Sequence, residues 1–307
     1  GVHVGLFRRW SLTMLTNIFG DDRCGIVDDH VDDDIVIRVE NVTKRFGQTT
    51  VLDGMNLAIK RGEVLVILGG SGSGKSTLLR TMTGAVQADE GRVLVNLPGR
   101  IEQPQNVCGM NDDQLDTYRR AIGVLFQSGA LFNSMTVAEN VALPMQLHAD
   151  LAQDIIDISV TMKLEQVNIR HAADRLPSEL SGGMKKRAGL ARALALDPQI
   201  LFYDEPSAGL DPITSAEVDQ LICDLNKLLG VTSIVVTHEM DSAFRIADRM
   251  VLLNKGKFVA DGTRDWFRET DDERIRQFVD GNADGPWTSG TEKADGYETA
   301  LLGRSSR

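Results

Sequence analysis

The stretch VLVILGGSGSGKSTLL, residues 64–79, decides how the rest of the chain is interpreted. Five apolar residues, 64–68, predict a strand that is buried on both faces. A turn of glycine and serine follows, and Lys75 and Ser76 then open an apolar helical run. Their spacing fits the phosphate-binding P-loop pattern. A ligand-free turn is the alternative, but such turns rarely carry Lys-Ser at this position. We therefore predict that this stretch binds a nucleotide.

Each residue type in this stretch has a physical reason. Residues without bulky side chains let backbone N–H groups surround a polyphosphate, and a helix that begins at Lys75 points its positive end at the phosphates. The Lys75 ammonium can neutralise the β and γ oxygens, and the Ser76 hydroxyl can bind Mg²⁺. The residues predicted to hold the nucleotide are Gly69, Gly70, Ser71, Gly72, Ser73, Gly74, Lys75, Ser76 and Thr77.

The composition of the chain limits the class of protein. Its 307 residues are 42% hydrophobic and 25% charged, as in ordinary globular proteins. The longest apolar runs have about five residues, far fewer than the ~20 that span a bilayer. The net charge of −11 argues against a general nucleic-acid binder. Cys24, Cys108 and Cys223 have no metal-binding spacing and are predicted to be free thiols.

The acidic charge is concentrated at the two ends. Residues 1–34 contain seven Asp and three Arg, and residues 271–307 contain eight acids and five bases. We expect an N-terminal extension at 1–34, a globular body at 35–270 and a tail at 271–307. Apolar residues at helical spacing from Phe7 to Ile18 leave a short membrane-surface helix as the alternative to a disordered extension.

From Ile35 onward, strand patterns alternate with helical ones. Ile35, Ile37 and Val39 alternate as in a half-buried strand, and residues 98–111 show no strong pattern. Helices are predicted after the P-loop, from Ser181 onward and at 218–229, and mainly helices and connectors at 151–164 and 174–180. Strands are predicted at 35–39, 51–59, 64–68, 91–96, 122–127, 200–205 and 233–238, with a hairpin at 249–262. The alternation predicts an α/β fold with a mostly parallel sheet.

Polar residues follow several of these strands, where α/β sheets place ligand chemistry. Asp204 can help to bind Mg²⁺, and Glu205 can polarise a water molecule aimed at the γ-phosphate. His238 and Gln127 each end an apolar strand, from which a side chain could reach the γ-phosphate or its metal. Taken alone, each is more simply a structural or solvated residue, and the P-loop upstream favours the chemical interpretation.

A second candidate phosphate site lies in LSGGMKKR, residues 180–187. Ser181 is a good helix N-cap, and Gly182 and Gly183 free the first-turn N–H groups for an anion. More than a hundred residues separate this helix start from the P-loop, and one triphosphate cannot easily contact both within one chain. We therefore predict a homodimer in which two chains share each nucleotide.

The motifs GGSGSGKS, Gln127, LSGGM, ILFYDEP, SAGLD and His238, in this order, resemble the ATPase subunits of ABC transporters. The resemblance extends from residue 35 to about 262. It implies a P-loop NTPase of the ABC-ATPase type, with a mostly parallel core sheet, an antiparallel β subdomain and a helical subdomain at about 130–197. The stretches around Gln127 and Ser181, and RQFVDGNADGP at 276–286, are similar to the ATPases of Mce-type lipid transporters. Met184, where the wider family usually has Gln, is typical of that branch.

The resemblance also implies roles for single residues. Phe46 would stack on adenine, a place where Tyr is commoner, and Ser181, Gly182 and Gly183 would meet the γ-phosphate held by the second protomer. Residues 207–211, with Asp211, would connect the two sites, and Gln127 and residues 128–141 would face a membrane permease. The implied catalytic residues are Glu205, His238, Lys75 and Gln127, and the implied Mg²⁺ ligands are Ser76, Gln127 and Asp204.

The implied activity is hydrolysis of ATP, with Mg²⁺, to drive lipid transport through an integral-membrane permease. The implied partners are a second copy of the chain, this permease and an Mce-domain lipid-binding protein, but no nucleic acid. The expected location is the cytoplasmic face of the inner membrane. Two alternatives are a small-solute transporter ATPase and a soluble ABC ATPase acting on DNA or ribosomes. The second usually has two cassettes or a long coiled coil, which this sequence lacks.

The tail carries scattered large apolar residues. We predict that it forms an extended strap whose anchors bury on the neighbouring subunit, and a disordered end is the alternative. The predicted anchors are Phe278, Val279, Trp287, Tyr297, Leu301 and Leu302.

Overall fold

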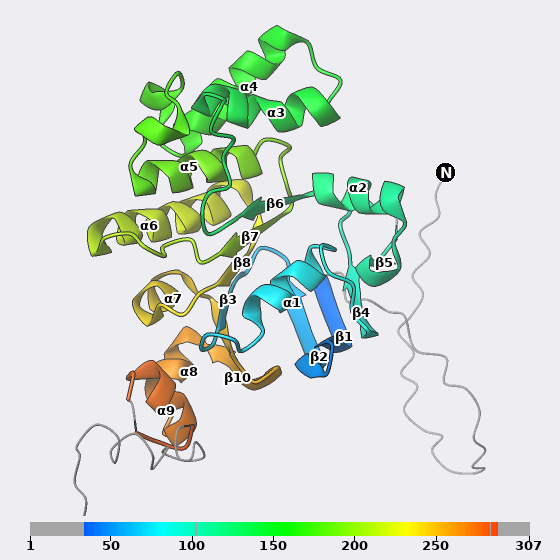
Figure 1. Cartoon of the computed structure of the whole chain (residues 1–307), viewed down its shortest axis with the longest axis vertical. Coiled ribbons are helices and arrows are strands. Elements are labelled where there is room, and N and C mark those ends of the chain that lie inside the picture. Colours follow the sequence, from blue (N-terminus) through cyan, green and yellow to red (C-terminus); the bar gives the residue numbers. More distant parts are fainter. Residues whose placement is uncertain (1–33, 102, 283, 288–307) are drawn as a thin grey trace, which may run out of the picture. The chain divides into compact units, whose positions relative to one another are not determined.

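The computed structural model describes residues 34–101, 103–282 and 284–287. Apart from Asp34, the predicted N-terminal extension therefore lies outside the described residues. A six-stranded sheet in the order β10-β9-β3-β8-β7-β6 forms the centre of the described chain (Figure 1). All its pairs are parallel except that of β10 with β9. The strands are β3 (Val64–Leu68), β6 (Ile122–Leu125), β7 (Ile200–Asp204), β8 (Thr232–Val236), β9 (Arg249–Asn254) and β10 (Lys257–Thr263).

The central strands are buried on both faces, as the sequence predicts. Along β3, Val64, Val66 and Leu68 belong to one hydrophobic cluster, while Leu65 and Ile67 belong to a second cluster. Side chains alternate along a strand, so these two clusters are the two faces of the sheet. The mostly parallel α/β fold predicted from the sequence is confirmed by this sheet.

A second, antiparallel sheet has the order β2-β1-β4-β5. Its strands are β1 (Ile35–Phe46), β2 (Thr49–Lys60), β4 (Glu90–Val95) and β5 (Gln105–Asn106). The expectation that the start of β1 is half-buried is wrong, because Val36 and Ile37 are both fully buried. An irregular register with β2 between Ile35 and Ile37 interrupts the simple alternation of faces.

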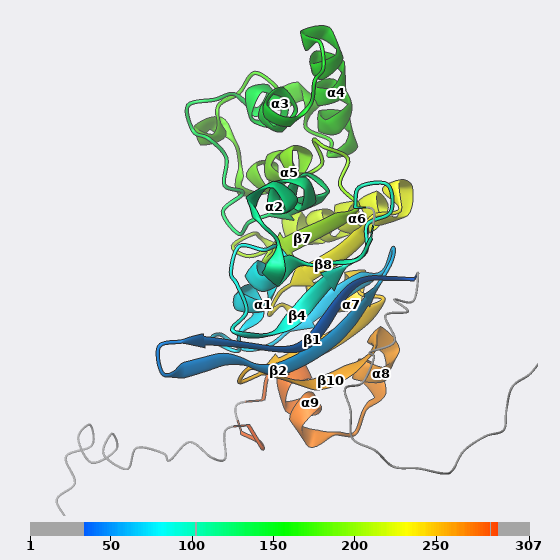
Figure 2. The same ribbon diagram turned by 90° about the vertical axis from the view of Figure 1, so that its right-hand side faces the viewer.

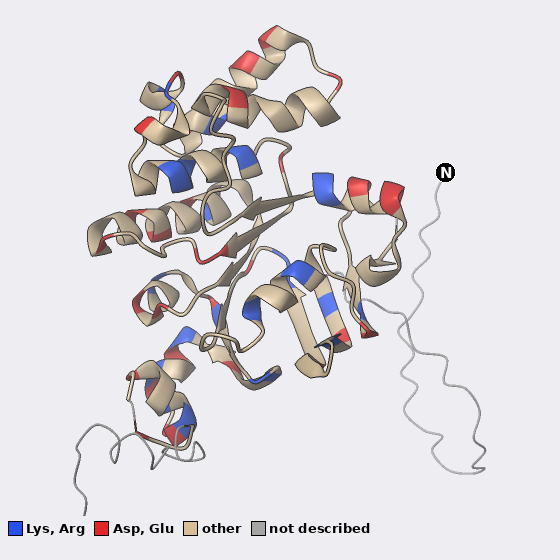
Figure 3. Cartoon of the chain, in the orientation of Figure 1, with Lys and Arg blue, Asp and Glu red and all other residues tan. Residues whose placement is uncertain are grey.

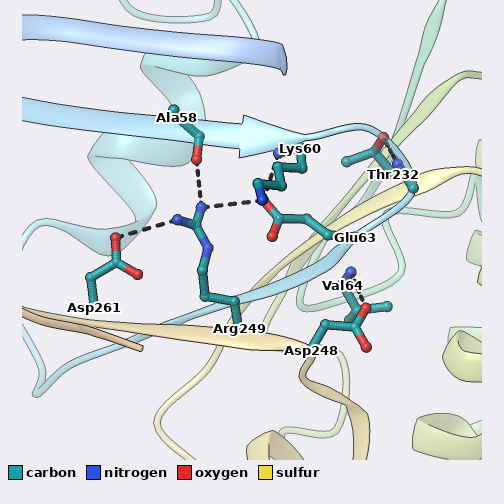
Figure 4. A network of polar contacts seen from close by, with 9 residues as sticks. Ala58, Lys60, Glu63, Val64, Thr232, Asp248, Arg249 and Asp261 are labelled. Carbon is teal, nitrogen blue, oxygen red and sulfur yellow. Dashed lines mark hydrogen bonds and ion pairs between the residues drawn. The ribbon is translucent and has the colours of Figure 1, made fainter. Parts of the chain in front are cut away.

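A network of polar contacts joins the two sheets (Figure 4). The Arg249 guanidinium of β9 donates to the Ala58 carbonyl of β2, to Glu63 Oε1 at 3.2 Å and to Asp261 Oδ2 of β10 at 3.4 Å. Glu63 also accepts the Lys60 backbone N–H at 2.6 Å. Burial raises the pKa of the Glu63 carboxyl, while the Lys60 N–H and Arg249 lower it. This network fixes the antiparallel sheet against the edge of the core sheet.

Three helices, α3, α4 and α5, pack on one another beyond α6 and β7 (Figure 2). They fall within residues 130–197, the range predicted for a helical subdomain. Helices α2 and α3 were not predicted from the sequence, although both begin with a capping box, Asn111 with Gln114 and Thr136 with Glu139. The α-helices are α1 (Lys75–Met82), α2 (Asp112–Arg120), α3 (Val137–His148), α4 (Gln153–Gln166), α5 (Gly182–Ala193), α6 (Pro212–Leu229), α7 (Met240–Ile246), α8 (Arg264–Glu269) and α9 (Glu273–Val279). Short 3₁₀ turns are η1 (Val107–Gly109), η2 (Arg170–Ala172) and η3 (Pro177–Glu179).

The first part of the predicted tail folds back on its own chain. Phe278, Val279 and Trp287 pack against the hydrophobic cluster that contains Val64, Val66 and Leu68. Gln277 Oε1 accepts the Trp287 backbone N–H at 2.8 Å, and the rings of Phe278 and Trp287 lie 5.6 Å apart. The expectation of an extended strap is therefore wrong for these three anchors, which find a burial site close by in sequence. Its other anchors, Tyr297, Leu301 and Leu302, lie outside the described residues.

Candidate nucleotide site

Three neighbouring strands end at the same level of the core sheet. In the middle strand, Val236 of β8 pairs with Ile67 of β3 on one side and with Asp204 of β7 on the other. The P-loop follows β3, Glu205 follows β7 and His238 follows β8. The parallel register therefore brings these three segments together at one edge of the sheet.

The P-loop fits closely against the chain around it. A Cβ atom at Gly69 would lie 2.4 Å from the Leu253 carbonyl oxygen, and one at Gly74 would lie 2.8 Å from the Val51 carbonyl oxygen. Only glycine can occupy these two positions without moving neighbouring backbone. Helix α1 begins after Gly74 with no side-chain cap and no acid in its first turn. Its first N–H groups and positive end are therefore free for an anion.

The Lys75 side chain lies over the P-loop. Its Nζ donates to the carbonyl oxygens of Gly69 at 2.7 Å and of Gly70 at 3.0 Å. Burial lowers the pKa of Lys75, and the nearby carboxylates of Glu205 and Asp204 raise it. Ser73 Oγ is buried and has no hydrogen-bond partner among the described residues. The Lys75 ammonium could exchange its carbonyl partners for phosphate oxygens, and the Ser73 hydroxyl could donate to one. Both groups therefore suit a polyphosphate in this loop.

The second polar pair connects α1 with β7. Ser76 Oγ lies 3.3 Å from Asp204 Oδ1. Burial raises the pKa of the Asp204 carboxyl, the hydrogen bond from Ser76 lowers it, and the charge of Glu205 raises it. A hydroxyl beside a carboxylate, next to a phosphate loop, is a donor set that suits Mg²⁺. A divalent cation would favour the ionised form of Asp204.

Glu205 and His238 form a third pair. His238 Nδ1 lies 2.9 Å from Glu205 Oε2, and the Glu205 side chain is 13% exposed while that of His238 is 60% exposed. Glu205 has a left-handed backbone with a φ of 51°, and its N–H donates to the Val236 carbonyl at 2.9 Å. Non-glycine residues adopt this conformation rarely and at a cost. Glu205 thus has an unusual backbone conformation, and its carboxylate lies beside the exposed imidazole of His238.

The second glycine-rich helix start forms a separate unit with α6. Ser181 caps α5 by accepting the Met184 N–H at 3.3 Å, and a Cβ atom at Gly183 would lie 2.4 Å from Thr214 Cγ2. The Thr214 hydroxyl donates to Asp211 Oδ2 at 2.6 Å, and this bond holds the pKa of Asp211 below its usual value. Within the described part of the chain, no hydrogen bond joins residues 181–183 to residues 69–77.

Both glycine-rich helix starts lead into helices that carry only basic charges (Figure 3). Helix α1 contains Lys75 and Arg80, and α5 contains two Lys and two Arg, while neither contains an acid. This arrangement is notable in a chain whose net charge is −11. Neither helix therefore carries a carboxylate that would repel an anion at its N-terminus.

Two predicted site residues stand apart from these groups. Gln127 is exposed, and its side chain has no hydrogen-bond partner among the residues that the structure describes. Phe46, at the end of β1, is 53% exposed, with Lys44 Nζ 5.4 Å from its ring centroid. The structure leaves the Phe46 ring open to stacking but does not bring Gln127 into contact with Ser76 or Asp204.

Two buried charged residues at the site were missed from the sequence. Lys186 of α5 donates to the Glu205 carbonyl at 2.9 Å, and Asp219 of α6 accepts from Ser207, Ser242 and Arg245. Asp219 could have been found, because it lies beside Val218 and Ile222 on the apolar face of a helix. Nothing in the pattern of residues distinguishes Lys186 from its neighbour Lys185.

Comparison with known proteins decides the family. A family model described as ABC transporter matches residues 52–208. The phospholipid transport ATP-binding protein MlaF of Haemophilus influenzae is 41% identical over 251 residues, which cover 82% of this chain and 92% of MlaF. The chain belongs to the ABC transporter ATPase family. The MlaF protein of Escherichia coli K12 is 42% identical, with 82% and 91% covered.

Other relatives of this ABC ATPase extend the comparison. A probable ribonucleotide transport ATP-binding protein, mkl of Mycobacterium leprae, is 39% identical, covering 87% of this chain and 76% of mkl. The dimeric, post-hydrolysis MJ0796 cassette bound to ADP and Pi has a TM-score of 0.66 and 32% identity, covering 74% of this chain and 98% of that one. The structure of cbiO1 from Clostridium perfringens, part of the ABC transporter complex cbiONQ, has a TM-score of 0.70 at 32% identity, covering 80% of this chain and 95% of that one. The predicted ABC-type fold and ATPase class are confirmed.

Proposed function

We propose that this ABC ATPase hydrolyses ATP to drive a membrane permease that moves phospholipid or another apolar substrate. The observation that supports hydrolysis is the convergence of Lys75, the Ser76–Asp204 pair and the Glu205–His238 pair at one edge of the sheet. The MlaF relatives support the substrate class, because they align over nine-tenths of their own length and are named for phospholipid transport.

ATP would bind with its phosphates in the P-loop. The Lys75 ammonium would leave its present carbonyl partners and, together with the free N–H groups at the start of α1, hold the β and γ oxygens. Ser76 and Asp204 are the residues that would hold Mg²⁺, with Gln127 as a further ligand if its exposed side chain turns inward. Mg²⁺ supplies charge neutralisation on the phosphates when bound. Phe46 would stack on the base.

Glu205 would then act on the attacking water. Its carboxylate accepts the water proton, and His238, 2.9 Å away, keeps the carboxylate oriented. An exposed imidazole at this strand end can also reach the γ-phosphate. The cost of the left-handed backbone at Glu205 is consistent with a functional position, since such strain is concentrated at active sites.

Each ATP would be shared by two chains. Ser181, Gly182 and Gly183 cap a helix that lacks acids, and they make no hydrogen bond to their own P-loop among the described residues. They would contact the γ-phosphate held by a second copy. Asp211 is linked to the same turn through Thr214, so it would connect the two sites of the homodimer.

The proposal extends to the remaining partners and to the location of the ATPase. Residues 128–141 would face the permease, and an Mce-domain protein would present the lipid. The ATPase would lie on the cytoplasmic face of the inner membrane. Among the described helices, none combines the length and the apolar character needed to cross a bilayer. The mkl relatives favour a rival substrate, because their name specifies ribonucleotide transport and they align over 271 residues.

The test of hydrolysis is the Glu205→Gln substitution. The amide keeps the shape of the side chain but cannot accept the water proton, so turnover should fall ~10²–10⁴-fold while ATP still binds. Glu269→Gln, which changes an exposed acid on α8, is the matched control. We would measure phosphate release and ATP-dependent dimerisation by light scattering. Wild-type turnover in Glu205→Gln would refute the assignment.

The shared site is tested by mixing two inactive variants. Ser181→Arg damages the helix start that faces the second chain, and Lys75→Ala damages the P-loop. A heterodimer of the two has one site with both parts intact, so mixing should restore hydrolysis. A mixture as inactive as its parents would contradict the shared geometry. Phospholipid or ribonucleotide stimulation of the permease complex in liposomes would then decide between the substrate classes.

A further inference from the structure

Lys186 places a positive charge inside the protein at an unexpected point. It lies on α5, five residues after the Ser181 cap, and is 5% exposed. Its Nζ donates to the backbone carbonyl of Glu205 at 2.9 Å. A buried ammonium is retained only where its partners compensate for the lost water.

The carbonyl that Lys186 holds belongs to a strained residue. Glu205 has a φ of 51°, and its N–H is fixed by the Val236 carbonyl at 2.9 Å. On its other side, the Glu205 carbonyl accepts a longer bond of 3.3 Å from the Ala208 N–H, and the shorter bond comes from Lys186. The direction of the Glu205 side chain depends on this backbone conformation, since φ sets where Cβ points.

The charges around Lys186 favour its bond to the Glu205 carbonyl. Burial lowers its pKa, while the carboxylates of Glu205, Glu239 and Asp204 raise it. The ammonium is therefore surrounded by acidic groups that favour its charged form. A charged donor makes a stronger bond to a carbonyl than a neutral one does.

We propose that Lys186 is a positioning residue for hydrolysis, which holds the Glu205 backbone so that its carboxylate is aimed at the attacking water. This rests on the proposed role of Glu205. Lys186 does not touch the nucleotide, and it acts only through Glu205.

The position of Lys186 on α5 adds a second consequence. Five residues of helix span about 7.5 Å, so Ser181 and Lys186 move together as parts of one rigid element. Ser181 meets the nucleotide of the second chain, and Lys186 holds the catalytic carboxylate of its own chain. When the dimer closes, a shift of α5 would move Lys186 and with it the Glu205 backbone of the same protomer. Contact of Ser181 with the ATP of the second chain would thus be coupled to alignment of Glu205 at the ATP of its own chain.

Homodimers of three Lys186 variants and one Lys185 control variant test the positioning role. Lys186→Met removes the donor and keeps the length of the side chain, so kcat should fall about tenfold to a hundredfold, while KM for ATP changes less than about threefold. Lys186→Arg retains a charged donor and should recover most of kcat, and Lys186→Gln covers the case in which the Met variant does not fold. Lys185→Met, the same change one residue earlier, has no bond to Glu205 and should retain wild-type kinetics.

The variant is then combined with Glu205→Gln. If Lys186 acts only through Glu205, adding Lys186→Met should lower the residual turnover of Glu205→Gln by less than about twofold and leave its ATP-dependent closed dimer intact. A further tenfold loss in the double variant would overturn the proposal. So would a Lys186→Met enzyme with wild-type kcat, or one whose losses in kcat and ATP affinity are equal and are not restored by Arg.

Mixed dimers decide on which side of the interface Lys186 acts. In a mixed dimer with Ser181→Arg, the Lys186→Met chain supplies its intact helix start to the P-loop site of the Ser181→Arg chain. That site has wild-type Lys186 and Glu205, so hydrolysis should be restored. With Glu205→Gln, no site combines a wild-type Lys186 and Glu205, so hydrolysis should stay low. Restoration only in the second mixture would overturn the proposal. If Glu205→Gln itself turned over normally, the proposed catalytic role would fail instead, which separates the two outcomes.

Discussion

Asp219 provides a quantitative test of how the site is held together. It lies on α6 and is 1% exposed, and both its carboxylate oxygens are used. Oδ1 accepts the hydroxyls of Ser207 at 3.1 Å and Ser242 at 2.5 Å, and Oδ2 accepts Arg245 Nη1 at 2.8 Å. Ser207 follows Glu205 in the chain, and Ser242 follows His238. This single carboxylate therefore ties together the two segments that carry the Glu205–His238 pair.

The cost of removing it can be worked from these contacts. In Asp219→Ala, the two serine hydroxyls, 2% and 1% exposed, lose their acceptor, at about 1–3 kcal/mol each. Arg245 is 44% exposed and can return to water, so its loss adds little. We expect a total of about 3–5 kcal/mol, in the range for breaking a buried ionic contact. Asp219→Asn keeps an acceptor for both serines and loses mainly the ion pair, so it should cost about 1–2 kcal/mol.

Urea unfolding of the full chain, followed by circular dichroism, measures both variants. Ser207→Ala/Ser242→Ala is the control, because it removes the donors together with the need for an acceptor. Adding Asp219→Ala to that double variant should then cost less than adding it to the wild type. The hydrolysis rate should fall with Asp219→Ala, since the loop after Glu205 loses its anchor. A free energy of unfolding within about 1 kcal/mol of wild type would refute the reasoning.

Two further predictions concern the end of the described chain. Asp272 caps α9, and its hydrogen bond with the Arg274 side chain lowers its pKa from the usual 3.8 to about 2. Because the pKa is lower in the folded state, the ionised carboxylate stabilises the fold above pH 3.8, and this stability is lost as the pH falls through about 2. Amide exchange in α9 should therefore accelerate over that range. The pH dependence should weaken in Asp272→Asn. Trp287→Ala removes a ring packed on Phe278 and should destabilise the protein by about 1–2 kcal/mol, less than full burial would give. An unchanged thermal unfolding temperature would mean that this contact contributes nothing.

The local, contiguous parts of the site were predictable from the sequence. The strand, glycine turn and helix at 64–79 are determined by residues next to one another, because glycine conformation, buried apolar runs and helix starts depend on short-range sterics. The cap at Ser181 and the acids at the end of β7 have the same local character. Resemblance then extended these motifs to a family that the comparisons confirm.

The contacts between distant segments could not be predicted in this way. The bond from Lys186 to the Glu205 carbonyl depends on how α5 packs on β7, and the Asp219 contacts depend on the spacing of α6 and α7. Trp287 could not be placed from the sequence either, because the same sequence pattern is expected whether its ring packs on a neighbouring subunit or on its own chain. The side-chain pattern is compatible with either, and only the burial site that the core offers decides between them.

The sequence by itself predicted which residues would hold a nucleotide and act on the attacking water, since each role needs a particular side chain at a particular local spacing. Only the tertiary structure decided how they are aligned. Val236 pairs with Ile67 on one side and Asp204 on the other, and this register places Lys75, Glu205 and His238 at one edge of the sheet. Register is a property of strand pairing over long separations in the chain, where many weak contacts act together.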